Sequence, residues 1–390
     1  MNNKFILGID ASNISAGGGL THLIELLKVI SPSIYGFNKV IVWASYDTLE
    51  NISSRKWLIK KSNKFLDKNI LFRVIWQKFI LGSDARRENC DLLFIPGGSF
   101  ITKFRPIVTM NQNLLPFEWR VIKKYGISFH TVKWLLLRYS QRKSFIKANG
   151  VIFLSQYAMN IVQKLTQVIN GRKVIIPHGI ETNFFTSPRT QYPISEYSKN
   201  NPLKIIYVTS LEPYKNNLSV IKAVATLRES GLPINLDLYG RGSKKNKNKI
   251  NRLINYYDKY GSIQYYGSIP HSKLPSIYNN ADIAIYASSC ETFGQTLLEG
   301  MAAGLPTICA NNSTMPEILG SAGVYFDVNN FEEMLEVLRN FIISPKLREQ
   351  KAELAFQKAN YYTWHKCADE TFKFFDLIIQ DKLNYYKEIN

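Results

Sequence analysis

Residues 290–306 have the sequence CETFGQTLLEGMAAGLP, which is the most informative part of this chain. The apolar run that precedes it, residues 281–286, is typical of a buried strand. The stretch itself predicts a short helix, which Gly304 ends and Pro306 prevents from continuing. A strand, a loop and a helix in this order indicate one α/β unit of a parallel sheet.

Two carboxylates lie on this unit, Glu291 in the loop and Glu299 on the helix. If the segment is helical throughout, they are at most ~12 Å apart, which fits the two ends of a nucleoside diphosphate sugar. The helix start between them offers backbone N–H groups and a positive dipole end, which suit a diphosphate. On local pattern alone, the two glutamates also fit an ordinary surface residue and a helix-start acid. The candidate donor-binding residues here are Phe293, Gly294, Gln295, Thr296 and Glu299.

The stretch resembles the Glu-x7-Glu signature of retaining glycosyltransferases of the GT-B fold, specifically family 4 (glycosyltransferase group 1). The usual form is Glu-x-Phe-Gly-x4-Glu-Ala-Met-Ala-x-Gly-x-Pro, and only Gly300, in place of the alanine, departs from it. Many members build bacterial surface polysaccharides. The resemblance implies an α/β protein with two Rossmann-like domains facing across a cleft and a C-terminal helix that crosses back to the N-terminal domain.

The rest of the chain is consistent with two domains, because 390 residues are too many for one ordinary core. Strand-like apolar runs alternate with helical segments. In the first half they are residues 5–9, 40–43, 71–75, 92–95, 107–110, 151–154 and 174–176. In the second half they are residues 205–208, 236–239, 263–266, 283–286, 307–309 and 324–326. We expect domains at 1–181 (with a terminal helix at about 366–390) and 203–365, joined by a polar linker, 182–202.

Residues 207–217 resemble the family's Val-Gly-Arg-Leu-x3-Lys-Asn element, whose arginine and lysine hold the donor diphosphate. Lys215 matches the lysine, but Ser210 stands at the arginine position. Arg241 is a candidate substitute, because it lies between two glycines where the family more often carries an acid. The alternative is that Arg241 begins the solvated basic loop 244–249.

A glycine-rich turn, Gly17 to Gly19, opens the first helix and exposes backbone N–H groups. It is not a dinucleotide fingerprint, because His22 stands where a third glycine would be needed. The resemblance implies a loop over the cleft, with Gly17 and Gly18 near the donor and Gly19 near the acceptor. A tight helix-start turn is the alternative.

Three polar residues of the first half are weaker acceptor-binding candidates. Asn111 and Asn113 follow a strand where many relatives have a His-Asp pair. Their amides can hydrogen-bond sugar hydroxyls but cannot act as acid or base near neutral pH. His178 lies in Pro-His-Gly-Ile-Glu, which resembles the family's hinge-proximal Pro-Asn-Gly-Val-Asp.

The sequence predicts neither a metal nor a cofactor. No Asp-x-Asp pair occurs, which fits an enzyme that neutralises the leaving phosphate with lysine and a helix dipole. The four cysteines are scattered without a C-x2-C pair, so we expect four buried thiols rather than a zinc site or disulfides.

The chain is strongly basic, with a formal net charge of +19 and a pI of about 9.6. Residues 101–150 hold ten Lys or Arg and one acid, with aromatic residues among them. Such a surface favours binding to anionic lipid over binding to nucleic acid, because no RNA-binding or helix-turn-helix motif occurs. The alternative is a solvated helix face. Without a signal peptide or an apolar run of ~18–20 residues, we expect a cytoplasmic protein, peripheral on the inner face of the membrane.

The resemblance implies a retaining, metal-independent, hexosyltransferase-type enzyme with Glu291 and Lys215 as catalytic residues. Its acceptor would be a hydroxyl of a lipid-linked glycan in bacterial surface polysaccharide synthesis, such as O-antigen or capsule. Two alternatives remain. The first is a nucleotide-sugar epimerase of the same fold, but the amides at Asn111 and Asn113 argue against it. The second is a catalytically silent binding protein, which the serine at position 210 favours.

Overall fold

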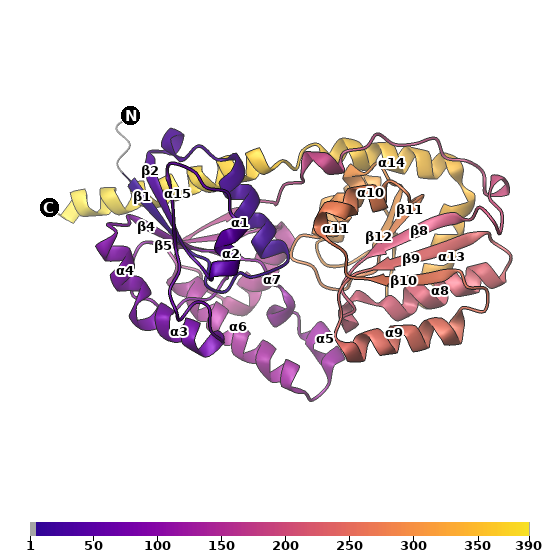
Figure 1. Cartoon of the computed structure of the whole chain (residues 1–390), viewed down its shortest axis with the longest axis horizontal. Helices are drawn as coiled ribbons and strands as arrows, with labels where there is room; N and C mark the ends of the chain where they lie inside the picture. Colours follow the sequence, from indigo (N-terminus) through magenta and orange to yellow (C-terminus); the bar gives the residue numbers. More distant parts are fainter. Residues whose placement is uncertain (1–4, 390) are drawn as a thin grey trace. The chain divides into compact units, whose positions relative to one another are not determined.

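The computed structural model of the protein describes residues 5–389, which divide into two compact units. Unit 1 consists of the chain up to residue 122, residues 127–179 and the chain from residue 363 onward. Unit 2 consists of residues 123–126 and 180–362. In both units strands alternate with helices (Figure 1), as they do in parallel α/β folds.

Unit 1 is built on a parallel sheet of seven strands in the order β3-β2-β1-β4-β5-β6-β7. The strands are β1 (Phe5–Asp10), β2 (Phe37–Trp43), β3 (Leu58–Lys61), β4 (Leu92–Ile95), β5 (Ile107–Asn111), β6 (Gly150–Phe153) and β7 (Arg172–Ile175). Every residue of β4, β5 and β6 is buried, because helices cover both faces of such a sheet. The helices are α1 (Gly18–Val29), α2 (Tyr46–Glu50), α3 (Ile70–Phe79), α4 (Leu81–Arg87), α5 (Trp119–Ile122), α6 (Phe129–Lys147), α7 (Gln156–Thr166) and α15 (Trp364–Ile389).

The last helix, α15, returns to unit 1, as the sequence predicts (yellow in Figure 1). Its aromatic side chains complete the core of the first sheet. Phe372 packs on Phe37 with ring centroids 5.7 Å apart, and Phe375 packs on Phe94 at 4.9 Å. The Tyr35 hydroxyl also donates to Asp369 Oδ1 at 2.7 Å. Unit 1 therefore depends on both ends of the chain.

Unit 2 is a second parallel sheet, with six strands in the order β10-β9-β8-β11-β12-β13. Counted from its own first strand this is the 3-2-1-4-5-6 order of Rossmann folds. The strands are β8 (Leu203–Val208), β9 (Ile234–Tyr239), β10 (Ile263–Gly267), β11 (Ile283–Tyr286), β12 (Thr307–Ala310) and β13 (Val324–Phe326). The helices are α8 (Asn217–Glu229), α9 (Lys244–Tyr257), α10 (Leu274–Tyr278), α11 (Gln295–Ala302), α12 (Met315–Leu319), α13 (Phe331–Ile343) and α14 (Pro345–Ala359).

The predicted strands are confirmed with one exception. Residues 71–75 form part of α3, so the strand predicted there is wrong. The Asn69 side chain caps this helix by accepting from the Leu71 N–H at 3.2 Å, and apolar residues recur four apart at 71, 75 and 79. The sequence does not predict strand β3. This strand lies at the edge of the sheet and only Leu58 is buried in it, so it has no continuous apolar run.

Residues 182–202, for which we expect a linker, are part of unit 2. The Thr186 N–H donates to the Ala302 carbonyl of α11 at 3.0 Å. The fully buried Arg348 of α14 donates to Gln191 Oε1 at 3.1 Å and to the Tyr192 carbonyl. These contacts fix the segment on two helices.

None of the helices within residues 5–389 combines the length and the apolar composition that a bilayer span requires.

Candidate active site

The predicted donor residues of unit 2 lie at the carboxyl ends of β8 and β11. These strands are neighbours in the sheet, and the chain leaves them on opposite sides, toward β9 and toward β12. Parallel α/β sheets bind ligands at such a switch point, because the diverging loops leave a crevice there. Ser210 and Lys215 follow β8, and Glu291 follows β11.

Lys215 and Glu291 form an ion pair at this switch point, with 12% and 19% of their side chains exposed. Burial acts to lower the pKa of Lys215, but the charge of Glu291, its hydrogen bond and the nearby Tyr207 and Cys290 together outweigh burial, and the pKa is raised. Lys215 therefore keeps its positive charge at neutral pH. A fixed ammonium group in a largely water-free site is suited to holding a phosphate.

The backbone on both sides of the pair is held by side chains. The Tyr207 hydroxyl donates to the Lys215 carbonyl at 2.6 Å. Asn216 follows in the left-handed region (φ 51°), and its Nδ2 donates to the Ala287 carbonyl at 2.6 Å, which joins the two loops. On the other side, the Glu291 N–H donates to Ser313 Oγ at 2.8 Å. The pair is thus preorganised.

Glu299, the second carboxylate of the signature, is buried with 2% exposure. The Tyr278 hydroxyl donates to its Oε2 at 3.2 Å, and His271 Nε2 lies 3.4 Å from its Oε1. Burial raises the pKa of Glu299, and the contacts with His271 and Tyr278 oppose that shift. A carboxylate has about four acceptor positions, so Glu299 can still accept hydrogen bonds from the hydroxyls of a ligand.

Helix α11 begins between the two carboxylates, as predicted. Gly294 precedes it with φ 97°, a left-handed conformation that favours glycine. The helix begins at Gln295, so its positive dipole end lies between the two carboxylates. Phe293 is buried against Tyr362, with ring centroids 5.7 Å apart, so it anchors the loop.

The departure from the signature at Gly300 has a structural cause. A Cβ at this position would lie 2.4 Å from the Tyr286 hydroxyl oxygen and 3.2 Å from Ala284 Cβ. Both neighbours belong to β11, so α11 packs directly on this strand. Tyr286 occupies the space that an alanine methyl group would need.

The structure brings Arg241 and Ser210 together. The Leu211 N–H donates to the Arg241 carbonyl at 3.0 Å. Gly240 has φ 144°, and a Cβ there would lie 1.6 Å from the Thr209 carbonyl oxygen, so the two loops can approach this closely only with glycine. The Arg241 side chain is exposed, next to the position where the family's arginine is missing.

Lys124 also lies in this region, although the sequence predicts that it belongs to the basic surface of residues 101–150. Residues 123–126 are part of unit 2, and Lys124 Nζ donates to Asn216 Oδ1 at 3.0 Å and to Ser289 Oγ at 3.2 Å. Burial lowers its pKa. A second cation therefore lies beside the loop of Lys215. Nothing in the sequence separates it from the neighbouring bases of residues 101–150.

The candidates of unit 1 form a separate group. Gly17 (φ 70°) precedes α1, and Gly17 and Gly18 are exposed. The position of a Cβ on Gly19 would be 2.8 Å from Gln112 Oε1, so this turn lies beside the segment of Asn111 and Asn113. Asn111 is fully buried, with its Nδ2 donating to the Asn113 carbonyl at 3.2 Å, and Asn113 Oδ1 accepts from the Leu115 N–H at 3.1 Å.

His178 is also buried in unit 1, where it packs on His22 with ring centroids 4.9 Å apart. Burial lowers the pKa of His22 to about 4 and lowers the pKa of His178 well below its usual value. Both imidazoles are therefore neutral at physiological pH.

Comparisons with known proteins find similar sequences and similar folds. The sequence profile described as glycosyl transferases group 1 matches residues 189–358. The O-antigen chain mannosyltransferase B of Escherichia coli is 28% identical over 175 residues, which is 44% of this chain and 45% of that protein. The matched stretch thus spans less than half of this relative.

Two solved structures show how far the likeness in fold extends. The sucrose-phosphate synthase of Thermosynechococcus elongatus has a TM-score of 0.76 at 14% identity, covering 97% of this chain and 100% of that one. Anabaena HepE in complex with UDP and glucose has a TM-score of 0.66 at 16% identity, covering 95% and 99%. Residues 189–358 are therefore similar to the glycosyl transferases group 1, and the two Rossmann-like units have the GT-B fold.

Proposed function

We propose that this protein transfers a sugar from a nucleoside diphosphate sugar to an acceptor hydroxyl, with retention at the anomeric carbon. The observation that carries the proposal is the row of charged groups along β11 and α11. The largely buried pair Lys215–Glu291 lies at one end, the start of α11 in the middle and the buried Glu299 beyond it. Among the similar structures, HepE is described in complex with UDP and glucose.

Each part of the donor has a matching group in this row. The diphosphate would lie between Lys215 and the N–H groups at the start of α11, where charge-assisted hydrogen bonds are strongest. The ribose hydroxyls would bind Glu299, which Tyr278 and His271 hold in place. Glu291 would face the donor sugar. Arg241 would supply the cation that Ser210 does not.

In the chemical step, the bond between the anomeric carbon and the β-phosphate oxygen breaks, and a bond to the acceptor oxygen forms on the same face. The acceptor proton passes to the departing phosphate. This chain then needs no nucleophile of its own. Its contribution is positioning and electrostatic stabilisation of the departing diphosphate by Lys215 and the helix start. No step in this scheme requires a metal ion.

We also propose that the acceptor is lipid-linked and that unit 1 binds the inner face of the cytoplasmic membrane. Helix α6 exposes four apolar side chains at spacings of three and four residues, which lie on one face. They are Phe129, Val132, Leu136 and Tyr139. Exposed bases lie on the same helix, at Lys133, Arg142 and Lys143. Helix α3 adds Ile70, Leu71, Val74, Ile75 and Phe79, all exposed. An apolar stripe with adjoining bases suits an anionic bilayer.

The proposed function is tested in two steps. The melting temperature of the purified protein is first measured with a panel of nucleoside diphosphate sugars. A donor at 100 times its Kd stabilises the fold by ~2.7 kcal/mol. The donor that stabilises is then incubated with lipid-linked acceptor, and the product is examined by NMR for the configuration of the new linkage.

Transfer with an unchanged anomeric configuration supports the proposal. An inverted product refutes retention, an epimerised donor indicates the epimerase alternative, and binding without turnover under any acceptor condition indicates a silent binding protein. Lys215→Ala is the control, because it should remove the stabilisation by donor while the protein remains folded.

A further inference from the structure

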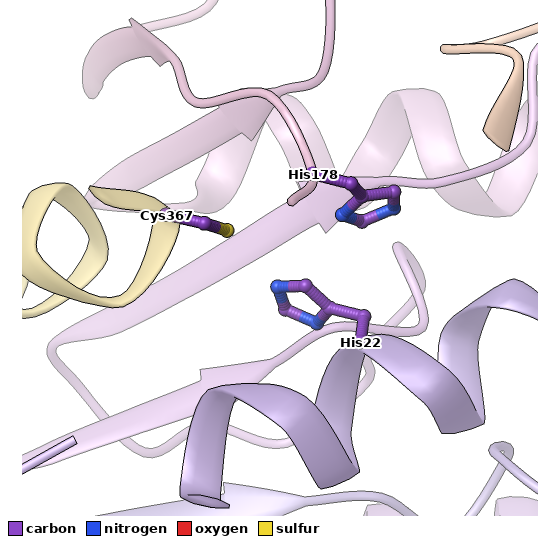
Figure 2. Close-up of side chains that lie close together, drawn as sticks. All are labelled: His22, His178 and Cys367. Atoms are coloured by element: carbon purple, nitrogen blue, oxygen red, sulfur yellow. The ribbon is translucent and has the colours of Figure 1, made fainter. Parts of the chain in front are cut away.

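Three side chains that could bind a metal ion converge in unit 1. His22 comes from α1, His178 from the segment after β7, and Cys367 from the first turn of α15. Figure 2 shows the two imidazole rings and the sulfur atom pointing toward a common space. One ligand atom from each residue lies within 4.8 Å of the other two. All three residues are buried, with exposures of 0%, 6% and 2%.

The surroundings of His22 are unusual for a structural histidine. Within residues 5–389, neither of its ring nitrogens has a hydrogen-bond partner. The aromatic rings of Phe94 and Trp364 flank it, at centroid distances of 6.4 and 6.0 Å. Buried polar atoms are normally satisfied, and one that is not calls for an explanation such as an ion. A metal bond would satisfy one nitrogen of His22.

We propose that His22, His178 and Cys367 bind one thiophilic transition-metal ion, with Zn²⁺ as the expected occupant. Imidazole nitrogen and thiolate sulfur are the ligands that zinc prefers. With Zn–N bonds of about 2.0–2.1 Å and Zn–S bonds of about 2.3 Å, the three ligand atoms would be roughly 3.3–3.8 Å apart. The three ligand atoms, which lie within 4.8 Å of one another, would have to close by about 1 Å on binding. Binding replaces the S–H bond of Cys367 by an S–Zn bond and releases the proton to solvent.

Such an ion would cross-link three segments that are remote in sequence. His178 lies two residues before the chain enters unit 2 at residue 180, and Cys367 lies shortly after the chain returns at residue 363. The backbones of these two segments already touch, because a Cβ on Gly179 would lie 2.1 Å from the Trp364 nitrogen. His22 adds the helix that begins at the glycine-rich turn. The metal would thus fix both connecting segments on the first helix of unit 1.

The test uses the purified chain of 390 residues, first stripped of metal with a chelator. Co²⁺ is titrated in as a spectroscopic probe, because a cobalt–thiolate bond gives a charge-transfer band that surface histidines cannot produce. We expect saturation at one ion per chain and displacement of the band by Zn²⁺. Zn²⁺ should also raise the melting temperature.

Cys367→Ala should abolish the charge-transfer band, and His22→Gln should weaken Zn²⁺ binding at least ~100-fold, since even loss of an outer-shell partner costs 10–100-fold. Cys90→Ala is the matched control, because Cys90 is also a buried thiol of unit 1 but lies outside the cluster. If Cys367→Ala does not fold, the cobalt titration of His22→Gln, compared with that of Cys90→Ala, still decides the question. A wild-type protein without the band, or a Zn²⁺ effect equal in wild type and His22→Gln, would overturn the proposal.

Discussion

At the scale of single residues, the proposed donor site depends on the Lys215–Glu291 pair. We predict that Lys215→Ala lowers kcat/KM at least ~10-fold, because it removes a charged hydrogen-bonding partner worth roughly 1.5–3 kcal/mol. Glu299→Ala should have an effect of the same size. Steady-state kinetics on the donor identified by thermal stabilisation measures both. Lys244→Ala, an exposed lysine of α9, is the matched control and should leave the kinetics unchanged. Near-wild-type turnover by a folded Lys215→Ala protein would show that this lysine does not hold the diphosphate.

The contact between α11 and β11 makes a prediction about stability. Gly300→Ala, which restores the usual signature, should destabilise the protein by about 1–3 kcal/mol through overpacking against Tyr286. Tyr286→Phe removes the oxygen that lies 2.4 Å from the new Cβ, so the double variant should regain part of the loss. Urea denaturation monitored by tryptophan fluorescence measures the difference. Gly18→Ala, where a Cβ meets nothing within 4 Å, serves as the neutral comparison. Equal stability of Gly300→Ala and wild type would mean that the strand and helix adjust freely.

Arg241 can be tested against the missing arginine of the family. If it supplies the second cation, Arg241→Ala should weaken nucleoside diphosphate binding, and adding Ser210→Arg should restore part of the affinity. Positions 210 and 241 lie on adjoining loops whose backbones are hydrogen-bonded to each other. An arginine introduced at position 210 would therefore lie close to the one removed at position 241. Isothermal titration calorimetry with the diphosphate gives the three affinities. An unchanged Kd in Arg241→Ala would assign this residue to the solvated loop instead.

The residues that could be predicted from the sequence belong to two short motifs. Glu291, Gly294 and Glu299 lie within nine residues, and Lys215 lies in a second short element. Two contacts could not be predicted, because they join distant segments. Lys124 reaches Asn216 from 92 positions away, and the His22, His178 and Cys367 cluster combines three separate elements. The spacing of apolar residues within a short segment carries no information about contacts between distant segments.

At the scale of elements, the apolar stripe of α6 is the feature that needs a partner. We predict that the protein sediments with anionic but not neutral vesicles and that binding decreases with salt, because charges are screened beyond ~8 Å at physiological ionic strength. Each base near the surface contributes about 1 kcal/mol, so reversing Lys133, Arg142 and Lys143 to Glu should abolish binding.

The matched control for this charge reversal is on α9 of unit 2. Lys244, Lys245 and Lys247 are exposed and change the net charge by the same amount when reversed to Glu. This control should still bind vesicles. Lys123 and Lys124 are unsuitable for the test, because both lie in unit 2 and Lys124 is hydrogen-bonded there. Phe129→Ser with Leu136→Ser tests the apolar part separately. Indifference of the wild type to both vesicle types at low salt would contradict a membrane role for α6.

The elements that could be predicted are those with a simple pattern. Parallel strands buried on both faces appear as continuous apolar runs, which is why β4, β6 and β11 were predicted from composition. Residues 71–75 of α3 predict a strand because an exposed apolar helix face gives the same composition over five residues. The contacts of residues 182–202 depend on Arg348, far along the chain, and a polar, proline-containing segment gives no sign of them.

At the scale of the whole molecule, the chain passes from unit 1 to unit 2 and back. Lys215, Glu291 and Glu299 all belong to unit 2, and residues 123–126 are its only part outside 180–362. We predict that a fragment of residues 180–362 folds and binds nucleoside diphosphate, with reduced affinity because Lys124 is absent. Circular dichroism and calorimetry on the fragment measure both properties. A fragment that folds but shows no affinity for the diphosphate would show that unit 2 alone does not contain the donor site.

The packing of α15 on the first sheet also dictates an order of events on the ribosome. Phe37 and Phe94 are synthesised early, but their partners Phe372 and Phe375 emerge only after all of unit 2. The second unit can therefore complete its core first, while the nascent first sheet displays an aromatic surface for most of translation. Such a surface is prone to aggregation and is a substrate for chaperones that act during synthesis. Translation that stops at residue 362 should yield a product with a finished second unit and an insoluble remainder.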